Sequence, residues 1–144
     1  MTTVLIALGS NLGDRAYNLR RAIRELSQIM RVVRVSSIHE TAAVDSPPGS
    51  PPYLNMVIAG STTLGPEAML REMLAIESRL GRAPRRLRNE PRVIDLDLIL
   101  HGAHRRRTRA LTLPHPRARQ RSFVMAPLAE VWKAQFPNGI AAQL

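Results

Sequence analysis

The sequence of 144 residues contains no cysteine, few aromatic side chains and about half as many acidic as basic residues. Without cysteine, disulfide bonds and thiolate metal sites are excluded. No apolar run approaches the roughly 18 residues of a membrane span, and the first residues lack the charged head and cleavage site of a signal peptide. We therefore expect a single cytoplasmic domain over residues 1–144 that does not associate with a membrane.

The shortage of acids is confined to one segment. The whole chain has 21 basic and 11 acidic residues, a formal net charge of +10. Residues 79–121 hold 13 arginines, and their only acids are Glu90, Asp95 and Asp97, so the rest of the chain is balanced. A segment of this kind implies a polyanionic partner, and both nucleic acid and a nucleotide polyphosphate qualify.

The spacing of apolar and turn-forming residues predicts alternating strands and helices. We expect strands over residues 4–8, 30–35, 54–63, 93–100 and 111–113, and helices over about 19–29, 66–80 and 122–132. Four prolines and a glycine between residues 42 and 52 predict a loop. The inner stripe of the second helix is expected to comprise Leu70, Met73, Leu74, Glu77 and Leu80.

This order of elements predicts an α+β fold. It is β-α-β-β-α-β followed by a C-terminal extension, the ferredoxin-like arrangement of an antiparallel sheet with helices on one face. The other face of the sheet would then be left for loops and a ligand.

A pair of aspartates on the fourth long strand carries the clearest chemistry. Because side chains alternate along a strand, Asp95 and Asp97 share one face, and Leu96 lies on the other. Two neighbouring carboxylates repel each other unless a cation lies between them, and Mg²⁺ commonly takes one or two carboxylates together with substrate phosphates. The alternative is a solvated strand edge with two surface acids. Arg92 belongs to the opposite face of a regular strand, but the bend expected at Pro91 leaves it able to reach the aspartates.

Two further groups of residues suit a nucleotide and a flat ring. His115 and Arg121 could clamp phosphate oxygens, although a turn with solvated arginines would use the same residues. Tyr53 and Asn55 share a strand face, where a ring can stack on a heterocycle and an amide can bond its edge, unless Tyr53 belongs to the core. Glu77 is either at the rim of its helix stripe or faces a ligand.

Taken together, these motifs resemble the 6-hydroxymethyl-7,8-dihydropterin pyrophosphokinases of folate biosynthesis over nearly the full chain. The matching segments are IALGSNLGD at 6–14, YLN at 53–55, PRVIDLDL at 91–98, LPHP at 113–116, and RSFV at 121–124 with PL at 127–128. The resemblance implies transfer of the terminal diphosphate of ATP to the hydroxymethyl oxygen of the pterin, with AMP as the by-product.

The resemblance also implies roles for individual residues. Two Mg²⁺ ions would be held by Asp95 and Asp97, and the catalytic residues would be Arg82, Arg92, Asp95 and Asp97. The pterin-binding positions would be Gly9, Thr41, Ala42, Val44, Tyr53, Asn55 and Phe123. The ATP-binding positions would be Leu70, Glu77, Arg82, Arg92, Leu98, Leu111, Thr112, His115 and Arg121, with the 82–92 stretch as a loop that closes over ATP.

Four positions depart from the common pattern of that family. Glu90 stands where a small Gly or Ala is usual, and Asn89 stands where some members have a tryptophan. Ala42 follows Thr41 where proline is frequent. Ala110 occupies the place of an arginine found in some members, for which Arg109 could substitute.

The main alternative is a basic, ferredoxin-like nucleic-acid-binding module. Such sheets stack bases on aromatic residues of adjacent strands, whereas Tyr53 is the only one of five aromatic residues expected on a central strand. A regulatory domain that binds a small ligand without turnover is a third hypothesis, against which the paired aspartates argue. We therefore expect a monomer that acts on ATP and the pterin without binding nucleic acid, and we expect residues 105–107 to be solvated surface.

Overall fold

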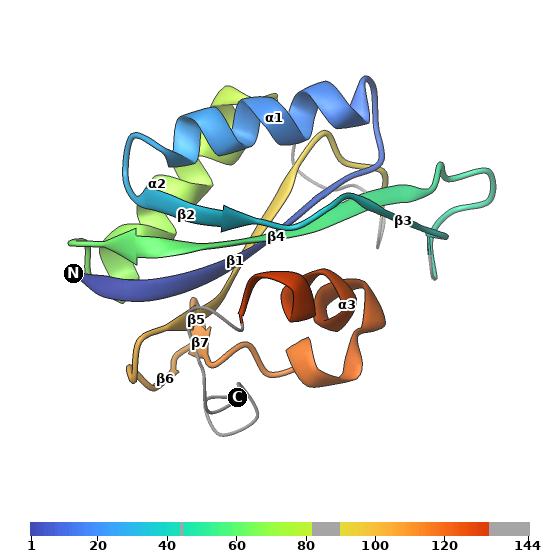
Figure 1. Ribbon diagram of the computed structural model, residues 1–144. Helices are drawn as coiled ribbons and strands as arrows, with labels where there is room; N and C mark the ends of the chain where they lie inside the picture. The colour runs from blue at the N-terminus through green and yellow to red at the C-terminus, as the bar shows by residue number, and fades with distance from the viewer. Residues whose placement is uncertain (44, 82–89, 133–144) are drawn as a thin grey trace.

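A computed structural model of the chain describes residues 1–43, 45–81 and 90–132 (Figure 1). The main elements are β1 (Thr2–Ser10), α1 (Arg15–Leu26), β2 (Arg31–Val35), β3 (His39–Thr41), β4 (Tyr53–Thr62), α2 (Pro66–Arg79), β5 (Asp95–His101) and α3 (Ser122–Val131). A short hairpin, β6 (Arg106–Arg107) and β7 (Thr112–Leu113), and a 3-10 turn over Ala118–Gln120 lie between β5 and α3. Of the helices described, none has both the length and the apolar character that crossing a bilayer requires.

The main sheet is antiparallel and has β1 and β4 at its centre. Its order is β2-β4-β1-β5, and β3 also pairs with β4 beyond the end of β2. The prediction of an α+β fold with an antiparallel sheet is confirmed, and β3 and β6 are additions to the predicted elements. Residues 45–52, the described proline-rich part of the segment before β4, form a loop, as expected.

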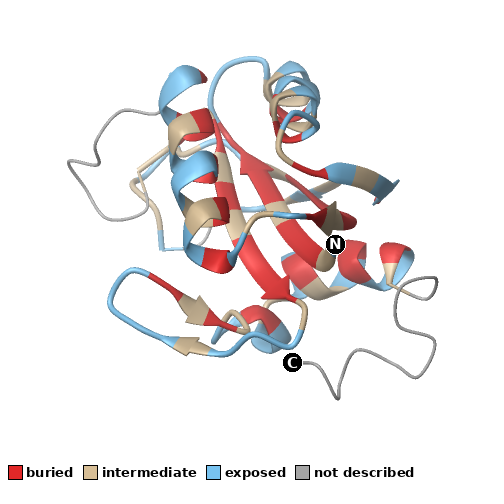
Figure 2. Ribbon diagram, turned by 90° about the vertical axis from the view of Figure 1, so that its left-hand side faces the viewer, coloured by how far each residue is buried: buried red, intermediate tan, exposed pale blue. Residues whose placement is uncertain are grey.

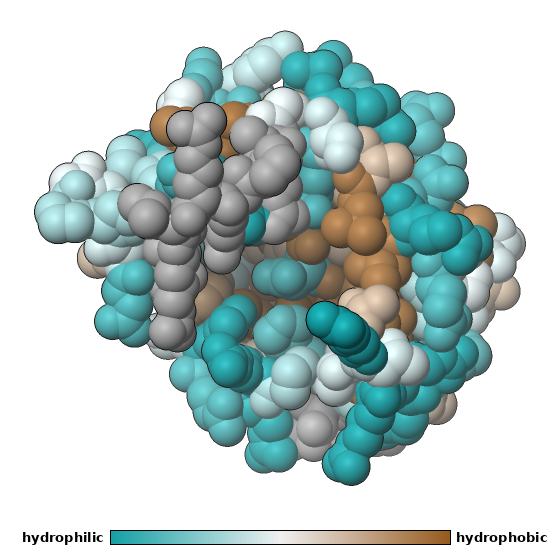
Figure 3. All heavy atoms as spheres, turned by 180° about the vertical axis from the view of Figure 1, so that it is seen from behind, coloured by the Kyte–Doolittle hydropathy of each residue, from teal (hydrophilic) through white to brown (hydrophobic). Residues whose placement is uncertain are grey.

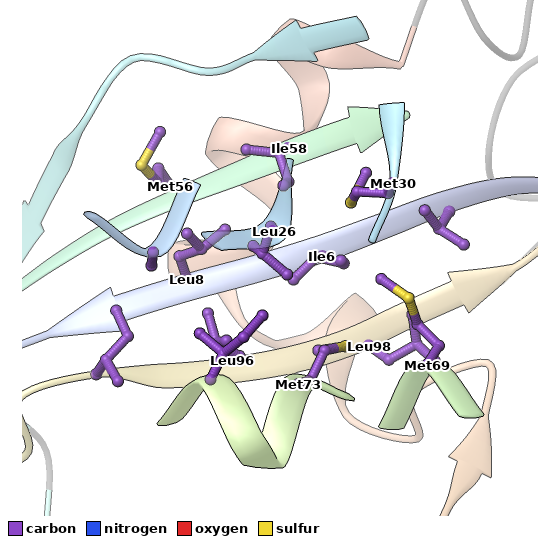
Figure 4. Packing of buried hydrophobic residues seen from close by; sticks show 14 of the residues in the cluster. Ile6, Leu8, Leu26, Met30, Met56, Ile58, Met69, Met73, Leu96 and Leu98 are labelled. Carbon is purple, nitrogen blue, oxygen red and sulfur yellow. The ribbon is translucent and has the colours of Figure 1, made fainter. Parts of the chain in front are cut away.

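Helices α1 and α2 cover one face of this sheet and form the larger core with it (Figure 1). Alternate strand residues point into this core, and Figure 4 shows them with the helix residues that meet them: Ile6, Leu8, Met56, Ile58, Leu96 and Leu98 from the strands, Leu26, Met69 and Met73 from the helices, and Met30 from the turn after α1. Asp14 begins α1 by accepting a hydrogen bond from the backbone N–H of Tyr17 at 3.1 Å.

The buried stripe of α2 is rotated from the predicted one. Met69, Met73 and Ile76 are buried against the sheet, whereas Leu74 is 50% exposed and Leu70 is only partly buried. A helix presents only one side to the core. Leu74 and Ile76 lie on nearly opposite sides of α2, so only one of them can face the sheet. The prediction that Leu74 belongs to the inner stripe is wrong.

The second face of the sheet is partly covered by α3, so the expectation of helices on one face holds only for α1 and α2. Figure 1 shows α3 on the side opposite α1 and α2. A smaller core there joins strand residues Leu5, Val57 and Ile99 to Val124 and Leu128 of α3. The central strands are therefore buried on both sides over part of their length (Figure 2). The remaining part of this face carries the polar residues described next.

Candidate functional site

Three neighbouring strands place functional residues in rows across the second face of the sheet. Gly9 of β1 lies opposite Asn55 of β4 on one side and opposite Asp95 of β5 on the other. In the next row, Ala7 lies opposite Asp97. Directly opposed residues of antiparallel strands project to the same face, so Asn55 and the two aspartates share one surface. Both aspartates are half-buried and alternate with buried leucines, as the strand pattern predicts.

Gly9 leaves the space in which the Tyr53 ring approaches the strand. A Cβ atom at Gly9 would lie 3.4 Å from Cδ1 of Tyr53 and 3.4 Å from Oδ1 of Asn55. The Asn55 amide is oriented by its Nδ2, which donates to Oγ1 of Thr41 at 2.7 Å. A ring, an amide and a hydroxyl thus meet at one end of the row, and any side chain at Gly9 would occupy the space between the first two.

Asp95 is linked to two other predicted site residues. Its Oδ1 accepts a hydrogen bond from Nη1 of Arg92 at 3.1 Å, and its Oδ2 lies 3.5 Å from the Tyr53 hydroxyl. Arg92 reaches the aspartate because its segment is not yet strand, as the proline before it predicts. Its side chain is only 9% exposed, and within the described part of the chain its buried Nε has no hydrogen-bond partner. A buried donor of this kind is costly unless a ligand satisfies it.

Asn11 is a residue of the site that the sequence reasoning missed. Its side chain is fully buried, and its Oδ1 accepts from the backbone N–H of Arg92 at 2.8 Å, while its own N–H donates to the Arg92 carbonyl at 3.0 Å. Its Nδ2 donates to the carbonyl of Pro51 at 3.2 Å. One amide therefore joins the end of β1, the proline-rich loop and the segment before β5. The sequence offered two signals for Asn11: it is a polar residue directly after a buried strand, and it lies within the matching segment at 6–14.

Glu77 supports β5 from the helix side. It is 3% exposed, and its Oε2 accepts a hydrogen bond from the backbone N–H of Leu96 at 2.9 Å. Since β5 is an edge strand of the sheet, this carboxylate satisfies a backbone donor that no further strand pairs with. Glu77 thus fixes the strand residue that stands between the two aspartates.

His115 and Arg121 lie after the β6–β7 hairpin, at the border of the aspartate row. The His115 backbone N–H donates to the Ile99 carbonyl at 2.9 Å, and its Nδ1 accepts from the N–H of Arg117 at 3.3 Å. Burial lowers the pKa of His115, with the Asp97 charge acting in the opposite direction. A neutral His115 with Nδ1 as acceptor carries its proton on Nε2. The Arg121 guanidinium lies over the Phe123 ring, 5.5 Å from its centre.

The other ATP-site residues predicted from the resemblance gather where α2, β5 and β7 meet. Leu98 and Leu111 are buried in the larger core, and Leu70 packs against it. Thr112 is half-buried on β7. Of the predicted pterin positions, Ala42 is exposed and follows β3. Seen from behind, the molecule is hollowed near its centre, with hydrophobic atoms inside and hydrophilic atoms around the rim (Figure 3). Arg82 and Val44 lie outside the described residues.

The described residues provide few metal ligands besides the two aspartates. Among them, no three or more histidine, aspartate or glutamate side chains gather closely enough to hold an ion. The donor set is therefore two carboxylates. It suits a hard ion that completes its shell with water and phosphate oxygens, and it does not suit a structural metal held by protein alone.

A second polar cluster, also missed from the sequence, joins α3 to the segment before β3. Glu130 accepts from the backbone N–H of Ser37 at 2.6 Å, from its hydroxyl at 2.7 Å, and lies 2.9 Å from Nε2 of His39. These contacts lower the pKa of Glu130 to about 2, with the Ser37 hydroxyl as the largest cause. Ser37 Oγ lies 3.3 Å from Nε2 of His39, the ring nitrogen that also faces Glu130. A proton relay from serine to glutamate would need both ring nitrogens, so His39 cannot act as one. The cluster is therefore a clamp between α3 and β3, and its geometry excludes a hydrolytic triad.

Comparison with known proteins shows the same family along almost the whole chain. Residues 5–133 match the family described as 7,8-dihydro-6-hydroxymethylpterin-pyrophosphokinase. The chain is 44% identical over 128 residues to the 2-amino-4-hydroxy-6-hydroxymethyldihydropteridine pyrophosphokinase of Bacillus subtilis, covering 88% of this chain and 75% of the relative. It is 34% identical over 131 residues to the protein of the same name from Aquifex aeolicus, covering 91% and 81%.

A plant relative is much longer than this chain. The mitochondrial folate synthesis bifunctional protein of Pisum sativum is 39% identical over 129 residues, which is 89% of this chain and 25% of the relative. The chain therefore spans about a quarter of the length of that protein.

Proposed function

Because the chain belongs to the 7,8-dihydro-6-hydroxymethylpterin-pyrophosphokinase family, we propose that it transfers the terminal diphosphate of ATP to the hydroxymethyl oxygen of 6-hydroxymethyl-7,8-dihydropterin. AMP is the second product, and the reaction serves folate biosynthesis. The observation that carries the proposal is the pair of rows on the second sheet face, where Asn55 and Asp95 flank Gly9 and Asp97 follows. One end of this arrangement can bind a flat ring, and the other end presents two carboxylates.

We assign the pterin to the end of the row near Tyr53. The Tyr53 ring offers a stacking surface, and Asn55, held by Thr41, offers amide groups to the edge of the heterocycle. Phe123, which is 36% exposed beside the guanidinium of Arg121, is the second ring. Ala42 and Val44 would add contacts from the loop after β3, and Gly9 leaves the floor of this region open.

We assign two Mg²⁺ ions to Asp95 and Asp97. Two adjacent carboxylates, with further oxygens supplied by phosphates and water, fit the ligand preference of this ion. When bound, the ions would neutralise charge on the diphosphate and template the two substrates. Arg92 and the Tyr53 hydroxyl orient the Asp95 carboxylate. Asp97 is the carboxylate we assign to accept the hydroxymethyl proton.

We assign ATP to the side of the site formed by β5, β7 and the start of α3. Leu70, Leu98, Leu111 and Thr112 would contact the nucleoside. Arg92, His115 and Arg121, together with Arg82, would donate to phosphate oxygens, and the unpaired Nε of Arg92 supports this. Glu77 would act by holding β5 in register. These donors stabilise an in-line transfer in which charge spreads over phosphate oxygens.

The sheet order supports a ferredoxin-like arrangement, in which β1, β2, β4 and β5 are the four principal strands. We also propose that the chain acts as a monomer. Nucleic acid binding is not favoured, because Tyr53 is the only aromatic residue on the described part of the sheet.

The test is formation of AMP. Chain, Mg²⁺, ATP and the hydroxymethyl pterin are mixed, and AMP is measured by chromatography against a mixture without pterin. We expect AMP and the pterin diphosphate in equal amounts. AMP no higher than in the control without pterin overturns the proposed reaction.

A further inference from the structure

A cavity of about 680 Å³ lies at the β6–β7 hairpin, and its described lining includes neither Asp95 nor Asp97. Three consecutive arginines, Arg105, Arg106 and Arg107, form one part of its wall, and residues 112–114 with Pro116 form the rest. Its volume lies in the range of small-molecule sites, roughly 300–1,000 Å³. The sequence analysis expected these arginines to be solvated surface, and Arg105 and Arg107 are exposed as expected, while Arg106 is half-buried. Their placement around one cavity is the additional observation.

The positive charge of this cavity is only partly compensated. Nε of Arg106 donates to Glu67 of α2 at 2.6 Å, and Nη1 donates to the carbonyl of Arg105. Arg105 and Arg107 are exposed, and among the described residues neither has an ion pair. No acidic residue lines the cavity. Two like charges on one wall repel each other, and an anion between them would relieve the repulsion.

The hairpin fixes the cavity wall. Arg107 lies directly opposite Thr112, and Arg106 opposite Leu113. The turn is closed by reciprocal bonds between Thr108 and Leu111: the Thr108 N–H donates to the Leu111 carbonyl at 2.9 Å, and the Leu111 N–H donates to Oγ1 of Thr108 at 3.0 Å. The backbone of Arg106 and Arg107 is thus held before any ligand arrives, which lowers the entropy cost of binding, and Arg105 directly precedes this strand.

We propose that this cavity binds a phosphate-bearing ligand through the guanidinium groups of Arg105 and Arg107. Guanidinium groups present paired donors that match phosphate oxygens. Thr112 adds a hydroxyl on the same face of the hairpin as Arg107. Neither arginine has a role in the proposed transfer, so their site is additional to it and borders the nucleoside contact assigned to Thr112. The phosphate could belong to a nucleotide that extends from the neighbouring site or to a separate anion.

The experiment uses inorganic pyrophosphate as the probe and amide chemical shifts of residues 105–108 as the readout, because these residues have no role in the proposed ATP site. We expect millimolar pyrophosphate to shift these signals in the wild-type chain. The double variant Arg105→Gln/Arg107→Gln should bind about tenfold more weakly at these signals. The matched control is Arg31→Gln/Arg34→Gln, which removes the same charge from exposed positions on β2 and should bind like the wild type.

Two further arms identify the source of the phosphate. If ATP alone shifts the same signals and pyrophosphate competes with it, the ligand is the nucleotide. If pyrophosphate shifts them while ATP is saturating, the ligand is a separate anion, and either result supports the site. The proposal is overturned if residues 105–108 show no shifts, or if both double variants weaken binding equally. The readout is binding, so its outcome is independent of the AMP test.

Discussion

The two faces of the sheet use the same strands for different purposes. On one face, alternate residues of β1, β4 and β5 are buried hydrophobic side chains beneath α1 and α2. On the other face, the intervening residues form a short core under α3 and then the row that contains Gly9, Asn55 and Asp95. Leu8 and Gly9 are adjacent in sequence and belong to different faces. At this point in β1, a residue that stabilises the fold is therefore followed directly by a residue of the candidate site.

The largest expected effect is on the chemical face. Asp97→Asn keeps the shape of the side chain and removes its charge, so turnover should fall on the order of a thousandfold. The melting temperature should change little, because the Asp97 side chain is half-buried and belongs to neither hydrophobic core. Initial rates of AMP formation and thermal melting of the same samples measure both quantities. If this variant unfolded at the assay temperature, Asp97 would have a structural role, and the two faces would not differ in function as described.

The converse change is in the core. Leu8→Ala removes a side chain that is 2% exposed and should lower the free energy of unfolding by about 2–5 kcal/mol. Below its melting temperature the variant should keep the KM values of the wild type. Urea unfolding and steady-state kinetics check this. A variant with normal stability and a raised KM would contradict the assignment of Leu8 to the structural face.

Gly9→Ala is a smaller change at the neighbouring position. The added methyl group lies at ordinary contact distance from Tyr53 and Asn55, so the fold should persist with stability within about 1 kcal/mol of the wild type. It fills the space beside the ring, and we expect about tenfold weaker pterin binding, measured by calorimetry. Gly65→Ala is the control, because a Cβ atom there meets nothing within 4 Å. If both variants bind the pterin equally well, the pterin does not bind beside Gly9.

The smallest effect concerns the clamp between α3 and β3. The pKa of Glu130 is lowered to about 2, so its contribution to stability is present above its ordinary pKa of 4.5 and is lost as the pH falls toward 2. Glu130→Gln should therefore lower the melting temperature above about pH 5, and its difference from the wild type should shrink between pH 4.5 and 2. Thermal melts across this range test the sign. A difference that grows on acidification would contradict it.

Local patterns predicted much of this fold, and pairings between distant segments were beyond them. Alternation on β5 separated Asp95 and Asp97 from Leu96, and the motifs indicated the family to which the chain belongs. Periodicity indicates that a residue is buried, but it does not identify the element that the residue packs against. The packing of α3 on the second face of the sheet therefore could not be inferred. Contacts between Asn11 and Arg92, or Ser37 and Glu130, join residues more than 80 positions apart and leave no trace in local spacing.

The buried amide of Asn11 has a consequence for how the two substrates communicate. It bonds Arg92, assigned to phosphate, and the carbonyl of Pro51, two residues before the ring assigned to the pterin. A shift of either segment disturbs bonds made to the other through one rigid side chain. We therefore expect occupancy of one proposed substrate site to change the affinity of the other through the hydrogen bonds of Asn11. By thermodynamic reciprocity, whatever the pterin does to ATP affinity, ATP does equally to pterin affinity.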